Sequence, residues 1–386
     1  MAQFYPARRR GLGRRFTRRT VLKGTALGAT GLAAAAFLGC EDDNGGNGGN
    51  GAGALDALSI SNWPYYIDAD TVANFQDETG ITTSYTQDIS DNDEFFGKIR
   101  EPLSRGQDIG RDIIVHTDWM AARLIRLGYV EELDKANIPN WVNLRDDLEN
   151  VAFDPGRKYS LTWQSGFTGI GYNPELTGRE LTSIDDIFDE AFSGHVTMLT
   201  EMRDTVGLTL LTMGKDPATA TVDDCLAAID KVSEYARSGH IRAFTTNEYG
   251  DDLVRGDVWA AFAWSGDVIQ LSQEDPNIKL LLPEQGFMVW SDNALIPKNA
   301  KHKAEAEAFL DYVYDPANQA LISAYVQFIS PVDGTKEAIV DIDPALADNQ
   351  LIFPNEQTLA NAKTFRPLDE EEEREVNEAF LTLIGA

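Results

Sequence analysis

Short apolar runs alternate with helix-length amphipathic segments through most of this chain, and this alternation constrains its fold more than any other feature. The apolar runs have the length and the β-branched content of buried strands, and Gly80 and Gly128 follow helical patterns where helices are expected to end. Parallel strands need long crossover connections, which helices usually supply. The alternation therefore predicts an α/β fold with a mainly parallel sheet from residue 55 onward.

The expected elements form two blocks joined by long extended segments. For the first block we expect strands at 58–63, 82–86 and 112–116 and helices at 69–79, 95–104 and 118–127. For the second block we expect strands at 195–199 and 258–264 and helices at 205–213 and 222–239. Residues 159–173 and 287–296 have the composition of extended crossovers between two lobes. Helices at 301–314 and up to about 327 follow, and the acidic run 369–373 is the start or the solvated face of the last helix.

The first 39 residues resemble an export signal. They contain eight Lys and Arg residues and no acid, with adjacent arginines at Arg18 and Arg19. An apolar run of about fifteen residues then ends at Gly39-Cys40, which is short of the roughly 20 residues that cross a bilayer as a helix. A transmembrane anchor and a basic nucleic-acid-binding arm are therefore weaker interpretations. The order resembles a twin-arginine signal joined to a lipoprotein cleavage box.

This signal implies a lipid on Cys40 and a position outside the cytoplasm, in the periplasm or at the cell surface. Phe37 stands where such boxes usually have Leu, so simple cleavage of the signal is the alternative to lipidation. Residues 40–54 are mainly Gly, Asn and acidic residues, and they predict a flexible tether that cannot bury a core. About 330 residues follow the tether, enough for two domains.

The charge balance excludes some partners. All 62 acidic residues but only 25 of the 33 basic ones lie after residue 39, which gives that part a net charge of −37. Such a surface repels nucleic acid and anionic membranes and attracts cations. It is also typical of a protein adapted to concentrated salt, in which case most of the acid carries no information about a ligand.

No catalytic or metal-binding pattern stands out in the sequence. The four histidines, His116, His195, His240 and His302, lack ligand-like spacing, and Cys225 lies on an amphipathic segment where we expect it in the core. Phosphate-binding glycine loops, paired-cysteine zinc spacings and the common hydrolase motifs are missing from the sequence. We expect no cofactor, no metal and no enzymatic activity, although the many acid pairs leave a surface hydrolase open.

From Ser61-Asn62-Trp63-Pro64-Tyr65-Tyr66 onward the chain resembles the extracytoplasmic solute-binding proteins of ABC importers, in their spermidine/putrescine-binding branch. The resemblance continues in order over roughly 270 residues, through 112–119, 159–173, 264–266, 290–300 and 301–316. It implies a type II periplasmic-binding-protein-like fold, in which two α/β lobes, each a mixed, mainly parallel sheet flanked by helices, enclose the ligand in a cleft. We expect residues 55–165 plus 291–331 in one lobe, residues 166–290 plus 332–386 in the other, and a monomer that delivers its ligand to a membrane permease.

The resemblance also implies a ligand site for a polyamine, whose ammonium groups favour aromatic faces and carboxylates. Met202 and Thr205 align with two family carboxylates, so we expect Glu201 and Asp204, one residue earlier, to replace them. The full expected set is Trp63, Tyr65, Tyr66, Asp118, Trp119, Glu201, Asp204, Trp264, Trp290 and Asp292.

Two further positions depart from the family pattern. Phe328 replaces a late tyrosine, and a residue near Phe365 replaces a C-terminal glutamine. Both replaced groups contact the far end of a long ligand. The expected ligand is a putrescine- or spermidine-like polyamine. A shorter or different amine, a neutral ligand, an amino-sugar, an opine-like compound and a chelated metal are the alternatives.

Overall fold

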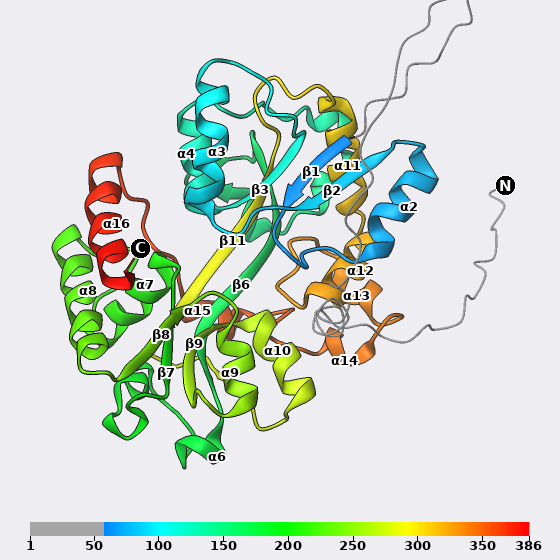
Figure 1. Cartoon of the computed structure of the whole chain (residues 1–386). Coiled ribbons are helices and arrows are strands. Elements are labelled where there is room, and N and C mark those ends of the chain that lie inside the picture. The colour runs from blue at the N-terminus through cyan, green and yellow to red at the C-terminus, as the bar shows by residue number, and fades with distance from the viewer. Residues whose placement is uncertain (1–57, 386) are drawn as a thin grey trace, which may run out of the picture. The chain divides into compact units, whose positions relative to one another are not determined.

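The structure is a computed structural model that describes residues 58–385 (Figure 1). The predicted signal, the tether and the lipidation site Cys40 lie outside these residues. The strands are β1 (Leu58–Asn62), β2 (Thr83–Gln87), β3 (Ile113–Thr117), β4 (Asn150–Val151), β5 (Asp154–Pro155), β6 (Ser160–Tyr172), β7 (Val196–Leu199), β8 (Ile241–Thr245), β9 (Ala260–Trp264), β10 (Lys279–Leu281), β11 (Phe287–Leu295) and β12 (Ala362–Lys363).

The α-helices cover both ends of the sheet that most of these strands form. They are α2 (Ala69–Thr79), α3 (Asn92–Ser104), α4 (Asp118–Arg126), α5 (Asp146–Glu149), α6 (Pro174–Thr177), α7 (Met202–Thr212), α8 (Val222–Arg237), α9 (Tyr249–Arg255), α10 (Ser265–Glu274), α11 (Lys303–Val313), α12 (Pro316–Val326), α13 (Thr335–Ile339), α14 (Pro344–Ala347), α15 (Glu356–Ala360) and α16 (Glu370–Ile384). Short 3-10 helices are η1 (Lys135–Asn137), η2 (Pro139–Asn143), η3 (Ile184–Phe188) and η4 (Glu190–Phe192).

A single ten-stranded sheet runs through the described residues, with eight strands in the order β2-β1-β3-β11-β6-β9-β7-β8. Strand β1 is parallel to β2 and β3, and β7 is parallel to β8 and β9. The central strands β6 and β11 are antiparallel to each other and to their neighbours β3 and β9. Each end of the sheet is therefore parallel, and the two predicted crossovers join the ends into one mixed sheet.

We call the half built on β1, β2 and β3 the first lobe, and the half built on β7, β8 and β9 the second lobe. Separate clusters of buried side chains lie in the two halves, around Phe75 and Phe309 in the first and around Val232 and Phe262 in the second. Figure 1 shows β6 and β11 passing from one half to the other. All thirteen residues of β6 are buried, as expected for a central strand that is covered on both faces. The predicted α/β fold class is confirmed.

Local sequence signals set most helix ends. Helix α2 ends at Gly80 with a left-handed φ of 74°, and Gly128 after α4 has a φ of 69°. Cys225 is fully buried on α8, which confirms its expected place in the core. Helix α7 begins at Met202, three residues before the predicted start, because the Glu201 side chain caps it by accepting a hydrogen bond from the Arg203 N–H. This earlier start places Asp204 on the first turn of the helix.

The C-terminal part of the chain returns to both lobes. Helices α13 and α14 pack against α12 through a small cluster that includes Ala320, Ile339 and Leu346. Helix α16 begins at the acidic run, with Asp369 as its N-cap, and packs against α8 through Val376 and Phe380. Within residues 58–385, no helix is long and apolar enough to cross a membrane.

Candidate ligand-binding cleft

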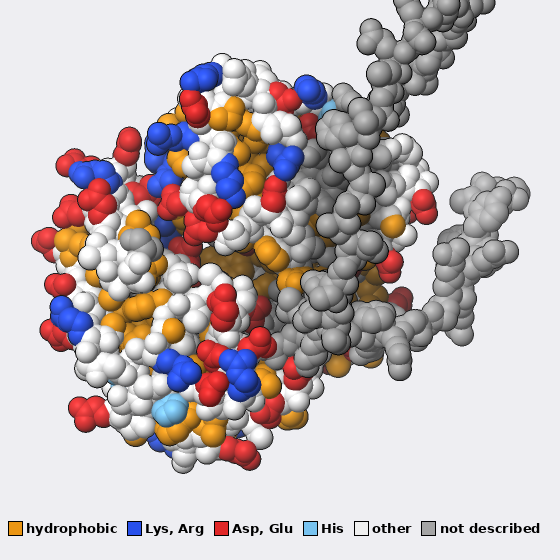
Figure 2. Space-filling model, in the orientation of Figure 1, with side chains coloured by type: hydrophobic (Ala, Val, Ile, Leu, Met, Phe, Trp, Pro, Cys, Tyr) orange, Lys and Arg blue, Asp and Glu red, His pale blue; other side chains and the backbone are white. Residues whose placement is uncertain are grey.

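The candidate site forms where β6 and β11 leave the first lobe and enter the second. On β11, Trp290 and Asp292 are two residues apart and so point to the same face of the sheet. Strand β3 leads into Asp118, the first residue of α4, and β9 ends at Trp264. Segments that are far apart in sequence therefore bring these candidate residues to the junction of the lobes, and Figure 2 shows a hollow with apolar side chains in this region.

A chain of hydrogen bonds fixes two tryptophans in this region. The Trp290 Nε1–H donates to Thr168 Oγ1 at 3.0 Å, and Thr168 in turn donates to Asp204 Oδ1 at 2.8 Å. The Trp264 Nε1–H donates to the other oxygen of Asp204 at 2.8 Å. One buried carboxylate therefore orients both indole rings, and Thr168, which the sequence analysis did not single out, connects them.

Glycines allow these rings to lie close to the backbone. A Cβ at Gly166 would be 2.4 Å from the Trp290 ring, and a Cβ at Gly266 would be 2.6 Å from the Phe328 ring. Phe328 makes edge contacts with both Trp290 and Tyr66, at centroid distances of 5.4 Å and 5.9 Å. Tyr66, Phe328 and Trp290 thus form a continuous aromatic wall, which gives Phe328 an apolar role where the family pattern has a tyrosine.

Asp292 lies beside this wall with an incomplete set of hydrogen bonds. The side chain is 5% exposed, and its Oδ2 accepts a hydrogen bond from the Tyr66 hydroxyl at 2.7 Å. Among the described residues, no group hydrogen-bonds to the buried Oδ1. Burial, reinforced by the nearby carboxylates of Asp118, Glu201 and Asp204, raises the pKa of Asp292 to about 8. A buried carboxylate oxygen that lacks a hydrogen-bond donor and a nearby positive charge attracts any cation that can reach it.

The other three acidic candidates share this electrostatic environment. Burial raises the pKa of Glu201 to about 7 and that of Asp204 to about 6. The charge of Arg203 lowers the pKa of Glu201, and the hydrogen bond from Trp264 lowers that of Asp204, but burial has the larger effect. Burial also raises the pKa of Asp118, whose Oδ1 accepts a hydrogen bond from Asn293 Nδ2 at 2.8 Å. Four carboxyl groups with raised pKa values therefore lie in one region, and a positive charge placed there would lower these pKa values again.

The remaining aromatic candidates lie in different surroundings. Trp63 is half-buried, and its buried Nε1 has no hydrogen-bond partner within residues 58–385. Tyr65 has a left-handed backbone with φ of 58°, and its N–H donates to Gln87 on β2. The ring of Trp119 is covered by the guanidinium of Arg203, with Cζ 4.0 Å from the ring centroid. Trp119 therefore already has a cation on one face, and no sequence pattern singled out Arg203.

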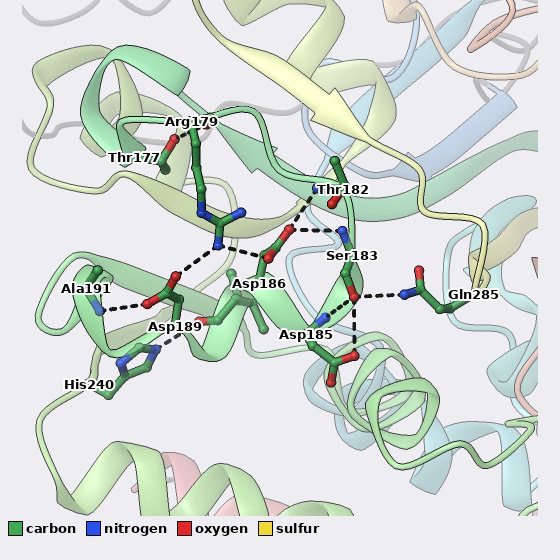
Figure 3. Close-up of polar contacts among 11 residues, drawn as sticks. Thr177, Arg179, Thr182, Ser183, Asp185, Asp186, Asp189, Ala191, His240 and Gln285 are labelled. Atoms are coloured by element: carbon green, nitrogen blue, oxygen red, sulfur yellow. Dashed lines mark hydrogen bonds and ion pairs between the residues drawn. The ribbon is translucent and has the colours of Figure 1, made fainter.

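A separate groove of about 720 Å³ lies on the second lobe, lined by Leu181, Thr182 and residues 281–285. Polar groups beside this groove already bond to one another (Figure 3). The Thr182 N–H donates to Asp186, Gln285 Nε2 donates to Ser183 Oγ, and Arg179 bridges two aspartates. Because these groups are satisfied internally, the groove has no buried charge that requires a ligand.

The hydrogen bonds of the four histidines link parts of the fold to one another. His116 and His302 bond to side chains of Asn92 and Asp112, and His195 and His240 bond to backbone carbonyls. None of these partners is a hydroxyl or thiol nucleophile. In the described part of the chain, no group of three or more His, Cys, Asp or Glu side chains is arranged to hold a metal ion.

Comparisons with known proteins give a consistent result. The family model described as bacterial extracellular solute-binding protein matches residues 70–352. The putrescine-binding periplasmic protein PotF of Escherichia coli is 29% identical over 331 residues, which cover 81% of this chain and 87% of that protein. The spermidine/putrescine-binding periplasmic protein of the same organism is 23% identical over 309 residues, covering 80% and 86%.

The fold has close structural counterparts as well. The spermidine/putrescine ABC transporter substrate-binding protein PotD from Streptococcus pneumoniae superposes with a TM-score of 0.72 at 23% identity. The superposition covers 85% of this chain and 98% of that one, so it includes both lobes.

Proposed function

Because this chain belongs to the bacterial extracellular solute-binding proteins, we propose that it captures a small polyamine and delivers it to an ABC permease. The curated relatives named above bind putrescine or spermidine by their descriptions, and this chain spans most of their length. The expected place of action is extracytoplasmic, as for those periplasmic relatives. Binding and release between two lobes need no covalent chemistry.

The buried carboxylate of Asp292 is the observation that carries this proposal. Its free Oδ1 lies in a cleft with raised carboxyl pKa values, and the indoles of Trp264 and Trp290 are held nearby through Asp204. An ammonium group supplies both the charge and the hydrogen-bond donors that this oxygen lacks. The aromatic wall suits the methylene chain that separates the ammonium groups of a polyamine.

A short diamine fits the residues better than a long polyamine. Phe328 offers no hydroxyl to a second or third ammonium group, and it packs between Tyr66 and Trp290. Phe365 packs against the apolar clusters of the second lobe. We therefore expect putrescine to bind more tightly than spermidine or spermine.

Titration calorimetry on the protein tests the proposal directly. Putrescine, spermidine, spermine and the uncharged analogue 1,4-butanediol are compared at low and at high salt. The expected result is binding of putrescine and no heat from butanediol, since butanediol keeps the chain length but lacks the charges. Absence of binding by all three amines in both salts would contradict the proposal, and mass spectrometry of ligand released from the purified protein would then identify the other solute.

We further propose that a lipid on Cys40 holds the receptor near its permease, a proposal that rests on the sequence of residues 1–54. Metabolic labelling with a fatty-acid analogue is expected to label the wild-type protein in its host. A Cys40→Ser variant is expected to lose this label and to leave the membrane fraction. Equal labelling of both proteins would contradict the lipid anchor.

A further inference from the structure

The acidic run at the start of α16 contains a residue with an unexpected environment. Glu373 is 5% exposed, although its neighbours in sequence lie on the surface. Its Oε2 pairs with Arg123 at 2.8 Å, and its Oε1 pairs with Arg203 at 2.6 Å. The two arginines belong to different lobes, because Arg123 lies on α4 and Arg203 lies on α7.

The position of α16 makes this contact a bridge. The helix packs on α8 in the second lobe, on the side that faces α3 and α4 of the first (Figure 1). The pair between Glu373 and Arg203 is internal to the second lobe, whereas the pair between Glu373 and Arg123 crosses from one lobe to the other. The crossing pair can persist only while the lobes are close together.

A stacking contact crosses the cleft at the same point. The Arg203 Cζ lies 4.0 Å from the centroid of the Trp119 ring, and Trp119 belongs to the first lobe. Arg123 Cζ lies 5.0 Å from the same ring and also pairs with Asp93 on α3 at 2.7 Å. Such cation–π contacts strengthen when the partners are desolvated. Trp119 is thus held by an arginine from the opposite lobe.

The charges of this cluster balance within the protein. Two guanidinium groups face the carboxylates of Glu373 and of the half-exposed Asp93, and Glu201 also acts on Arg203, so each buried charge has an opposite charge beside it. Arg203 also lies between Glu201 and Asp204 in the sequence, on the first turn of α7. Fixing Arg203 against the first lobe therefore fixes the turn that presents both candidate carboxylates to the cleft.

We propose that Glu373 is a positioning residue of the site: with Arg123, Arg203 and Trp119 it forms an interlobe latch that engages on closure and slows ligand release. The claim about ligand release rests on the proposed function. The claim about closure of the lobes does not, because every latch contact joins two groups of the protein itself. The latch favours the closed form of the unliganded protein too.

The first test measures the distance between the lobes without any ligand. Leu127 after α4 and Val254 on α9 are 44% and 38% exposed, and both are replaced by Cys and spin-labelled in the same protein. Cys40→Ser removes one natural cysteine, and Cys225 is buried and protected from the label. In this labelled full chain, Glu373→Gln is expected to shift the distance distribution toward longer, open distances.

Glu372→Gln is the matched control. It makes the same charge change one residue away, but Glu372 pairs with Arg366, which bonds to Ala220 within the second lobe. This variant is expected to keep the wild-type distances. Arg123→Gln, which breaks the latch from the other lobe, is expected to behave like Glu373→Gln. Wild-type distances in both latch variants would overturn the proposal, whether or not any polyamine binds.

The second test uses putrescine as the probe in stopped-flow measurements. Glu373→Gln is expected to raise the dissociation rate about tenfold and to change the association rate by less than twofold, since the latch forms after encounter. The unfolding temperature of the unliganded variant is expected to stay near the wild-type value, because the arginines regain water when the lobes open. A large drop in that temperature with unchanged putrescine release would show a purely structural role and would overturn the proposal.

Discussion

Asp292 and Glu373 are both buried carboxylates at the junction of the lobes, each 5% exposed, and they differ in how the protein satisfies them. Glu373 receives two guanidinium groups. Asp292 receives one tyrosine hydroxyl, and the carboxylates of Asp118, Glu201 and Asp204 act on it to raise its pKa. The protein thus completes one site with its own cations and leaves the other short of positive charge.

This difference separates an ion-pair cluster that the protein completes by itself from a candidate binding site. Burying a carboxylate without a cation costs free energy and destabilises the fold. Such a group is therefore retained mainly where a ligand supplies the missing positive charge. Two carboxylates with the same exposure can therefore act in different ways, one by attracting a cationic ligand and the other by holding the two lobes together. The following predictions test that contrast.

The largest expected effect is the loss of binding in Asp292→Asn. The amide keeps the shape of the side chain but removes the charge, and loss of one partner of a buried charge pair costs about 3–5 kcal/mol. Putrescine affinity measured by calorimetry should fall at least roughly 100-fold. Asp223→Asn, the same substitution at an exposed position on α8, is the control and should bind as the wild type does. Equal affinities of all three proteins would show that Asp292 is outside the site.

The next effect is a pH dependence of binding. The unliganded Asp292 has a pKa of about 8 and is mostly protonated at neutral pH, whereas a bound ammonium favours its ionised form. Binding therefore releases a proton, and affinity should fall about tenfold for each pH unit below 8. Calorimetry in buffers with different ionisation enthalpies measures the released proton directly. Proton release that persists in Asp292→Asn would assign the effect to another group, such as Glu201.

The third effect concerns stability without ligand. An unfolded Asp ionises near pH 4, but folded Asp292 stays protonated up to about pH 8, so the wild-type protein loses stability as the pH rises between these values. Asp292→Asn escapes this loss and should be more stable at pH 8 by several kcal/mol, since each unit of pKa shift corresponds to about 1.4 kcal/mol. At pH 4 the two proteins should differ little. Chemical denaturation at both pH values measures the difference, and a less stable variant at pH 8 would contradict the contrast with Glu373.

The smallest expected effect comes from Phe328→Tyr. The added hydroxyl restores a polar group to the wall beside Tyr66 and Trp290, and it should improve spermidine binding relative to putrescine by a few-fold. The ratio of the two affinities is the measurement. An unchanged ratio would mean that Phe328 does not contact the far end of the ligand.

Hydrophobic periodicity and the glycines that end helices predicted the main helices and strands well. Helix α2 has the predicted bounds, and strands β6 and β11 lie within one or two residues of the predicted crossovers. These elements have strong local signals: Gly80 ends the helix, and the long extended runs contain few residues that favour a helix. Helix α7 began earlier than predicted because its N-cap is a glutamate, a weaker sequence signal than Ser, Thr, Asp or Asn.

The site depended on tertiary contacts that periodicity does not contain. The resemblance supplied Asp292 and the tryptophans, and the structure brings Asp204 to Trp264 through a hydrogen bond. Glu373 lay in an acidic run that the sequence analysis assigned to the start or the solvated face of a helix. The helix start is correct, but the burial of Glu373 depends on two arginines that are 170 and 250 residues away in sequence. Single-sequence patterns carry no information about such pairs.

The central strands β6 and β11 have a consequence for how this protein can be divided. Each lobe needs strands from both halves of the chain, because β11 pairs with β3 of the first lobe and β6 pairs with β9 of the second. A fragment that stopped before β11 would leave the edge of β3 unpaired and would expose the apolar residues of β6. We therefore expect that neither lobe folds alone and that the two lobes do not unfold one after the other. Heating should give one cooperative transition for both.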